Sequence, residues 1–351
     1  MRILIVDTCY PAFLAAHYAR QPELRERSYD EQWRALMDTC FGTFDAYSHH
    51  LAPLGHEAHE FVANCEPLQR AWAEERGIAG DLSEVLLAQA RSFEPDVVYV
   101  QDLHYPSDVV LDGLRRHARL VVGQIASPPP GAARLRSFDL LLSSFPHFVE
   151  RFRGLGIDSE YLRIGFDPRV AERLAQEEDR RARYDVAFVG ALNRTQHRRA
   201  NGLLARAARR IPIDFWGYGL RGWPPWSPVR RRHHGEAWGM EMYRVLRDSR
   251  VALNRHIGLA GRYANNMRLY EATGVGTLLL TDAKSNLTEL FEPGEVVTYA
   301  SADELVERAR HFLAHEPERQ AIASAGQART LREHGYDRRM IELANLLEAR
   351  L

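Results

Sequence analysis

The stretch Asn265–Leu280 reads NNMRLYEATGVGTLLL and decides the fold of its half of the chain. Its pattern predicts a short helix, a glycine turn and a strand. We predict that Asn265 caps the helix, because asparagine is a favoured N-cap residue, and that Gly274 and Gly276 end it. The run Thr277–Thr281 is short and apolar, which is typical of a strand buried in a parallel sheet.

Glu271 has an unusual position in this helix. At about 100° per residue it falls on the same side as Met267 and Tyr270, at the edge of an apolar face. A carboxylate there needs a basic partner or a ligand hydroxyl, because burying an unpaired charge is costly. One interpretation is an ion pair with Arg268, three residues earlier. The other is a contact with a bound ligand, and the residues alone leave both open.

Apolar strands and helical segments alternate along the chain, with Gly and Pro at the breaks. This alternation is typical of an α/β fold with open parallel sheets covered by helices. Besides Thr277–Thr281, the predicted strands are Arg2–Asp7, His56–Val62, Asp96–Gln101, Leu120–Ile125, Asp139–Ser143, Glu160–Leu162, Val186–Val189, Ile213–Trp216, Val251–Leu253 and Glu295–Tyr299.

Two segments interrupt this alternation. Glu31–Leu51 is long and mixed in composition, and we predict that it is helical. Arg169–Arg183 is dense in charge and poor in large apolar residues, which favours an exposed helix or a linker between domains. We therefore expect an N-terminal domain over residues 1–168, a charged linker over 169–183 and a C-terminal domain over 184–351.

The composition argues against several classes of protein. The chain has 351 residues, enough for two domains, and its net charge of −1 gives no argument for binding nucleic acid or a membrane surface. No apolar run is long enough to span a membrane, and the N-terminus reads as a strand rather than a signal peptide. The three cysteines form no Cys-x-x-Cys pair, and an odd number argues against a disulfide framework, so we expect a cytoplasmic protein.

The segment Val189–Arg199, VGALNRTQHRR, follows a predicted strand and leads into a predicted helix. Gly190 allows the backbone to approach a ligand closely, and the N-terminus of the following helix carries partial positive charge. Arg194 adds a full charge. Together these features suit a diphosphate, although an ordinary turn with solvated arginines would have the same pattern.

The pattern Gly217-x-Gly219-x-x-Gly222 matches the fingerprint of dinucleotide-binding sites. We reject such a site, because the fingerprint requires a helix to begin at once and the run Trp223–Trp226, WPPW, forbids one.

Three polar residues of the N-terminal half follow predicted strands. Asp7 ends the first strand, and Asp102 and His104 follow the strand Asp96–Gln101. In parallel sheets, functional residues collect at the carboxyl ends of strands, so these three are our candidates for proton transfer. Histidine suits that role near neutral pH. The alternative for His104 is a side chain satisfied by its neighbours.

Four motifs together resemble a known family. They are Asn254–Arg255, Asn266-x-Arg268-x-x-Glu271, Leu278–Asp282 and Leu290–Phe291-x-Pro293–Gly294. They are similar to the CgeB-like (spore-maturation) branch of the GT-B glycosyltransferases, over roughly Tyr184–Glu316. The resemblance implies two Rossmann-like domains that face a cleft. In that family the last helix often crosses back to the first domain, and Met340–Leu351 is the segment that would do so here.

The resemblance also implies roles for residues of the C-terminal domain. Glu271 would hold the ribose hydroxyls of a sugar nucleotide, because two carboxylate oxygens can accept from both hydroxyls of a diol. Arg268 would contact the diphosphate or pair with Glu271. The residues implied to contact the nucleobase or to shape the pocket are Trp216, Gly217, Tyr218, Asn254, Asn265 and Asn266. One departure is Tyr263, which stands where the family's pattern has an earlier glutamate, and it leaves sugar recognition and stereochemistry open.

The expected function is that of a glycosyltransferase that uses a nucleoside-diphosphate sugar as donor and an unidentified hydroxyl as acceptor. No Asp-x-Asp motif ends a strand, so we expect no metal ion and no cofactor besides the donor, with arginine and a helix N-terminus offsetting the charge of the leaving diphosphate. A sugar-nucleotide epimerase of the same architecture and a non-catalytic nucleotide-sugar-binding protein remain alternatives.

Overall fold

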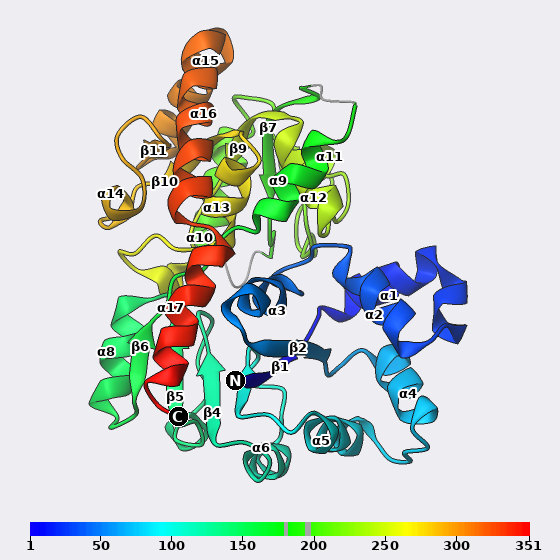
Figure 1. The fold of residues 1–351 in the computed structure, drawn as a ribbon. Coiled ribbons are helices and arrows are strands. Elements are labelled where there is room, and N and C mark those ends of the chain that lie inside the picture. The colour runs from blue at the N-terminus through cyan, green and yellow to red at the C-terminus, as the bar shows by residue number, and fades with distance from the viewer. Residues whose placement is uncertain (179–181, 194–197) are drawn as a thin grey trace. The chain divides into compact units, whose positions relative to one another are not determined.

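The computed structural model describes residues 1–178, 182–193 and 198–351, without the side chains of residues 198–200 (Figure 1). The chain divides into two compact units. Unit 1 comprises Met1–Arg163 and Asp337–Leu351, and unit 2 comprises Ile164–Tyr336. Within the described residues, no helix has both the length and the apolar character needed to cross a membrane.

Unit 1 is built on a six-stranded sheet in which all neighbouring strands are parallel. The strand order is β2-β1-β3-β4-β5-β6. Ile3, Leu4, Ile5 and Val6 of β1 are at most 1% exposed, because helices cover both faces of the sheet and a parallel strand is then apolar throughout. The strands are β1 (Arg2–Asp7), β2 (Glu57–Val62), β3 (Val97–Val100), β4 (Leu120–Gln124), β5 (Leu140–Ser143) and β6 (Ser159–Tyr161).

The helices of unit 1 come from both ends of the chain. Arg350, just after the last helix, pairs with Asp158 at 2.6 Å and with Glu160 at 3.1 Å, which fixes the end of that helix beside β6. The helices are α1 (Pro11–Arg20), α2 (Tyr29–Met37), α3 (Ala46–Leu51), α4 (Glu66–Glu75), α5 (Leu82–Phe93), α6 (Asp108–Arg115), α7 (Ala132–Leu135), α8 (Pro146–Gly154) and α17 (Tyr336–Glu348), with 3₁₀ turns η1 (Pro22–Glu26) and η2 (Ala52–Leu54).

The prediction of continuous helix over Glu31–Leu51 was wrong. Helix α2 ends at Met37 and α3 begins only at Ala46. Between them Cys40, Gly42 and Phe44 have φ values of 52°, 65° and 21°, which no right-handed helix can accommodate.

Unit 2 contains a five-stranded parallel sheet with the order β11-β10-β9-β7-β8. The chain runs from β7 outward to β8 and then returns to β9 on the other side of β7. The direction of winding therefore reverses between β7 and β9, and this is the position where open α/β sheets bind ligands. The strands are β7 (Tyr184–Val189), β8 (Asp214–Trp216), β9 (Ser249–Leu253), β10 (Leu278–Asp282) and β11 (Val297–Tyr299).

Helix α13 is buried on nearly all sides in unit 2. The Thr273 hydroxyl lies 2.6 Å from that of Thr330 on α16, and a Cβ at Gly274 would lie 2.7 Å from the Phe166 ring. The helices are α9 (Pro168–Ala175), α10 (Arg198–Ala207), α11 (Pro228–Arg231), α12 (Met240–Arg247), α13 (Met267–Gly274), α14 (Leu287–Leu290), α15 (Ala302–Ala314) and α16 (Glu316–Glu333), with the 3₁₀ turn η3 (Gly258–Ala260).

Candidate functional site

The N-terminus of α13 lies at the carboxyl edge of the sheet of unit 2. The cap residue is Asn266, not the predicted Asn265. The Asn266 side chain does not cap the helix, because it bonds across to Asn254, with Nδ2 donating to Asn254 Oδ1 at 2.9 Å. Asn254 in turn donates to the Thr281 hydroxyl at 3.0 Å. These contacts tie the start of α13 to the ends of β9 and β10. Asn265 is buried, and its amide oxygen accepts from Tyr270 at 3.1 Å.

Glu271 forms the ion pair that its sequence position suggested. Its Oε2 lies 2.8 Å from Arg268 Nη1, and the side chain is only 5% exposed. Burial raises the pKa of Glu271 above its ordinary value, although the Arg268 charge acts in the opposite direction. Arg268 Nη1 also lies 2.9 Å from Met242 Sδ, and Arg268 Nε has no hydrogen-bond partner among the described residues. The pair therefore retains an unused donor.

Sequence reasoning gave no role to Arg255, which follows β9. It is 8% exposed, and its Nη2 donates to the Ala191 carbonyl at 2.7 Å. The guanidinium also lies over the Phe188 ring, 5.5 Å from its centre. The bond to Ala191 bridges the loops that follow β9 and β7, the position where the winding reverses. Burial lowers the pKa of Arg255 to about 10.

His256 forms a second buried pair that the sequence analysis did not find. Its Nδ1 lies 2.7 Å from Asp282 Oδ1, and its backbone N–H donates to the same oxygen at 2.8 Å. Because the carboxylate accepts, Nδ1 carries the proton, and Nε2 is buried without a partner among the described residues. The two residues stand 26 positions apart in the sequence, so no local pattern signalled this contact.

The loops after β7 and β8 are packed directly against each other. A Cβ at Gly217, whose φ is 132°, would lie 2.0 Å from the Gly190 carbonyl oxygen. The Gly190 N–H donates to the Trp216 carbonyl at 2.9 Å, so this amide is not available to bind a ligand. Gly217 of the Gly217-x-Gly219-x-x-Gly222 pattern thus has a packing role, and the first helix after the pattern begins only at Pro228.

The two aromatic candidates differ in exposure. Trp216 is 5% exposed and its ring stacks on His234, with the centres 4.6 Å apart. Tyr184 covers another part of Trp216 edge-on at 4.7 Å. Tyr218 is 37% exposed and lies nearly parallel to Trp238 at 6.2 Å. Of the two, Tyr218 is therefore the ring that remains accessible to a ligand. Arg194, the predicted diphosphate contact, lies outside the described residues.

In unit 1 the predicted acidic residues come together where the sheet reverses its winding, between β1 and β3. The Thr8 hydroxyl, next to Asp7, donates to Asp102 Oδ2 at 2.8 Å. Burial raises the pKa of Asp7 to about 7, a bond from the Thr8 N–H opposes this, and the charge of Asp102 adds to the increase. A carboxyl with a pKa near neutrality can both accept and release a proton under ordinary conditions.

His104 is exposed and lies beside the same loop. Its backbone N–H donates to Asp102 Oδ1 at 3.0 Å. Its ring Nε2 lies 3.0 Å from the Pro128 carbonyl. A carbonyl only accepts, so Nε2 carries the proton and Nδ1 is left as the basic nitrogen.

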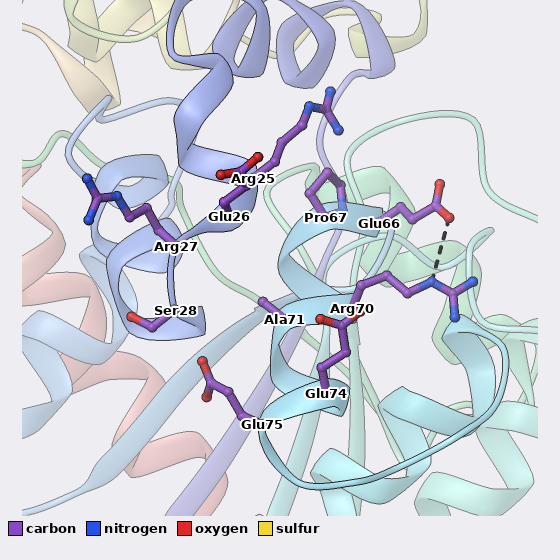
Figure 2. A pocket seen from close by; sticks show the side chains of 10 residues that line it. All are labelled: Arg25, Glu26, Arg27, Ser28, Glu66, Pro67, Arg70, Ala71, Glu74 and Glu75. Carbon is purple, nitrogen blue, oxygen red and sulfur yellow. Dashed lines mark ion pairs between the residues drawn. The ribbon is translucent and has the colours of Figure 1, made fainter.

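Unit 1 also has a pocket of about 590 Å³, and none of the predicted site residues lines it. Figure 2 shows the pocket and its lining side chains. It is formed by η1, the residues after it and α4. Its charged residues carry both signs, and one pair, Arg70 and Glu66, lies 3.7 Å apart. The lining residues are Arg25, Glu26, Arg27, Ser28, Glu66, Pro67, Arg70, Ala71, Glu74 and Glu75. In the part of the chain that the structure describes, no group of three or more acidic, histidine or cysteine side chains could hold a metal ion.

Comparisons with known proteins agree with this architecture. A family model described as glycosyl transferase-like matches residues 194–345. No curated protein sequence matches the chain. Sucrose-phosphate synthase from Thermosynechococcus elongatus is a similar structure, with 12% identity, a TM-score of 0.59, and coverage of 99% of this chain and 98% of the other.

Two further structures cover nearly the whole chain. Anabaena HepE in complex with UDP-glucose is 15% identical, with a TM-score of 0.58 and coverage of 99% of this chain and 100% of HepE. AviGT4, a glycosyltransferase involved in avilamycin A biosynthesis, is 15% identical, with a TM-score of 0.54 and coverage of 98% and 96%. The predicted fold class is thereby confirmed: the chain has the GT-B fold, with two parallel sheets, and residues 194–345 resemble glycosyl transferases.

Proposed function

We propose that this protein is a glycosyltransferase that moves a sugar from a nucleoside-diphosphate sugar to an acceptor hydroxyl. The observation that carries the proposal is Glu271, a buried carboxylate in the segment that matches the glycosyl transferase-like model. Its helix begins at the carboxyl edge of the sheet, where open α/β sheets bind ligands. Two oxygens of one carboxylate suit the two hydroxyls of a ribose.

The proposal assigns the donor to unit 2 and the acceptor to unit 1. Asp7 is the first choice for the group that accepts the proton of the acceptor hydroxyl, because its pKa of about 7 suits proton transfer at neutral pH. His104 is the second, through Nδ1. Asp102 receives bonds from Thr8 and the His104 N–H, and its role would be to orient both loops.

Three finer statements belong to the same proposal. The motifs quoted for the C-terminal half favour the CgeB-like branch. Transfer would proceed without a metal ion, with arginine and a helix N-terminus offsetting the charge of the leaving diphosphate. The protein would act in the cytoplasm, in line with its unpaired cysteines.

The test is a thermal-shift screen with UDP, dTDP, GDP and NAD, each with and without Mg²⁺. UDP comes first because HepE was solved with UDP-glucose and with UDP. A ligand at 100 times its dissociation constant stabilises the protein that binds it by about 2.7 kcal/mol. We expect one nucleoside diphosphate to raise the Tm without Mg²⁺, and Glu271→Ala to lose most of that shift.

The matched control is Glu295→Ala, which removes a unit 2 glutamate that lies 3.7 Å from Arg329. It should lower the Tm of the free protein but keep the ligand-induced shift. No shift with any nucleotide, or an equal shift in Glu271→Ala and wild type, would contradict the proposal. Incubation of the bound donor without acceptor then tests the epimerase alternative, because an epimerase would produce the epimer or free sugar. A transferase and a binding protein would both leave the donor intact, and only the transferase would consume it once an acceptor is added.

A further inference from the structure

Arg255 is a buried cation without a buried anion beside it. Among the described residues, no carboxylate lies within ion-pair distance of its guanidinium. Tyr299, Asp282 and Tyr218 are near enough to raise the pKa of Arg255 by their charge. Of these, the Asp282 carboxylate is already paired with His256 at 2.7 Å and with Lys284 at 3.4 Å. A charge removed from water without a partner costs several kcal/mol, so such a group needs an explanation.

The hydrogen bonds of Arg255 are also incomplete. Nη2 donates to the Ala191 carbonyl, whereas Nε is buried and has no partner among the residues that the structure describes. Most buried polar atoms in proteins have a hydrogen-bond partner, so an exception requires an explanation, and a functional role is one of them. The neighbouring His256 has a buried, unpartnered Nε2 as well. Two adjacent residues after β9 therefore retain unused ring or guanidinium nitrogens.

The position of Arg255 indicates what kind of group its unpartnered nitrogen could bind. The residue bridges the loops after β9 and β7, where the winding of the sheet reverses. Its backbone carbonyl lies 3.4 Å from Asn266 Nδ2, one residue before the helix that carries Arg268 and Glu271. A planar guanidinium with free N–H groups matches the oxygens of a phosphate.

We propose that Arg255 is a phosphate-binding residue of unit 2, and that the diphosphate of the donor supplies its missing counter-charge. This inference rests on the proposed function and gives a role to Arg255, a residue of the Asn254–Arg255 motif for which the sequence suggested none. In the free protein the unpaired charge of Arg255 destabilises the fold, and a bound diphosphate neutralises that charge. Binding is then selective for the diphosphate over the nucleoside.

The experiment compares Arg255→Met and Arg255→Lys with wild type. Arg319→Met is the matched control, because Arg319 is 6% exposed, donates to the Phe312 carbonyl at 3.0 Å and has an ion-pair partner in Glu316 at 3.4 Å. The Tm of each free protein is measured first. Calorimetry then gives the affinity for UDP, GDP and dTDP, for the three nucleosides, and for inorganic pyrophosphate.

We expect Arg255→Met to weaken binding of the preferred nucleoside diphosphate by about 10- to 100-fold, as expected for lost charge-assisted bonds. Affinity for the matching nucleoside should stay within about twofold of wild type, and the Tm of the free protein should be unchanged or higher. Arg255→Lys keeps the charge but not the planar fork, so its loss should be smaller. Arg319→Met should lower the Tm and leave all affinities unchanged.

Each contrary result has a distinct meaning. If wild type binds a nucleoside diphosphate and both Arg255 variants bind it equally well, Arg255 only holds the loop at Ala191 in place. The inference is then overturned, while the proposed function stands. An equal loss for nucleoside and diphosphate would also overturn it. If wild type binds neither nucleoside nor diphosphate, the proposed function itself fails, and the ligand assigned to Arg255 fails with it.

Discussion

Arg268 Nη1 and Glu271 Oε2 lie 2.8 Å apart, one turn along a helix that is buried on nearly every side. A buried ion pair contributes little net stability, but removal of one partner leaves an uncompensated charge. Arg268→Met should therefore cost about 3–5 kcal/mol in the free energy of unfolding at pH 7. The double variant Arg268→Met/Glu271→Met should cost less than either single variant, as measured by urea unfolding.

The pH dependence of these variants provides a check on the mechanism. Burial already raises the pKa of Glu271, and loss of Arg268 raises it further. A protonated Glu271 carries no charge, so Arg268→Met should lose less stability at pH 5 than at pH 7. Costs of the single variants that add up in the double variant would contradict coupling between the two side chains.

Asp7 should make the free energy of unfolding depend on pH in a defined direction. Its pKa rises from 3.8 to about 7 on folding, so the folded state binds the proton more tightly. Stability should then fall as the pH rises from about 4 to about 7, by at most ~4 kcal/mol at 1.36 kcal/mol per pH unit. Asp7→Asn should remove this decrease and should also abolish glycosyl transfer if Asp7 is the base.

Glu60 provides a control for Asp7 within the same unit. It is buried, bound by the Ser48 hydroxyl at 2.7 Å, and burial raises its pKa to about 8. Glu60→Gln should likewise flatten the pH dependence of stability, here up to about pH 8. It should leave transfer activity and its pH profile unchanged, so a loss of activity in both variants would indicate damage to the fold rather than to a catalytic group.

Gly217 should tolerate no side chain. Alanine there would bring Cβ to 2.0 Å from the Gly190 carbonyl at a φ of 132°. Gly222 also has a positive φ, 85°, but a Cβ there meets no atom within 4 Å. Gly222→Ala should therefore cost about 1 kcal/mol from backbone strain alone. Gly217→Ala should cost at least ~2 kcal/mol more in thermal unfolding, because the loops must separate. Equal costs would contradict the packing role.

Leu347 tests the contribution of α17 to unit 1. Its side chain is fully buried, whereas Ile341 on the same helix is 49% exposed. Leu347→Ala should cost about 2–5 kcal/mol and Ile341→Ala within about 0.5 kcal/mol. Amide hydrogen exchange locates the effect: Leu347→Ala should speed exchange in β1 to β6 and leave the strands of unit 2 unchanged.

Most of the fold followed from local patterns, because buried parallel strands are continuous apolar runs and Gly and Pro separate them. The structure has a strand in every segment where one was predicted. The break between α2 and α3 was missed because only Gly42 signalled it, while Cys40 and Phe44 adopt positive φ values that their residue types disfavour.

The site was less predictable than the fold. Glu271 and Arg268 are three residues apart, so helical spacing was enough to pair them. Arg255 belongs to a quoted motif, but its burial and its contact with Ala191 gave no such signal, since an arginine after a strand is usually solvated. The pKa of Asp7 likewise depends on burial and on Asp102, which is distant in the sequence.

The two-part composition of unit 1 has a consequence for biosynthesis. A ribosome releases Met1–Arg163 first and α17 only after the whole of unit 2. The six strands of unit 1 are therefore complete while the helix that packs with them, and about half of the chain before it, is still being synthesised. Unit 2 is continuous in sequence and can fold as soon as it emerges. The nascent N-terminal sheet is thus the part of the chain with the longest exposure to aggregation and chaperone binding during translation.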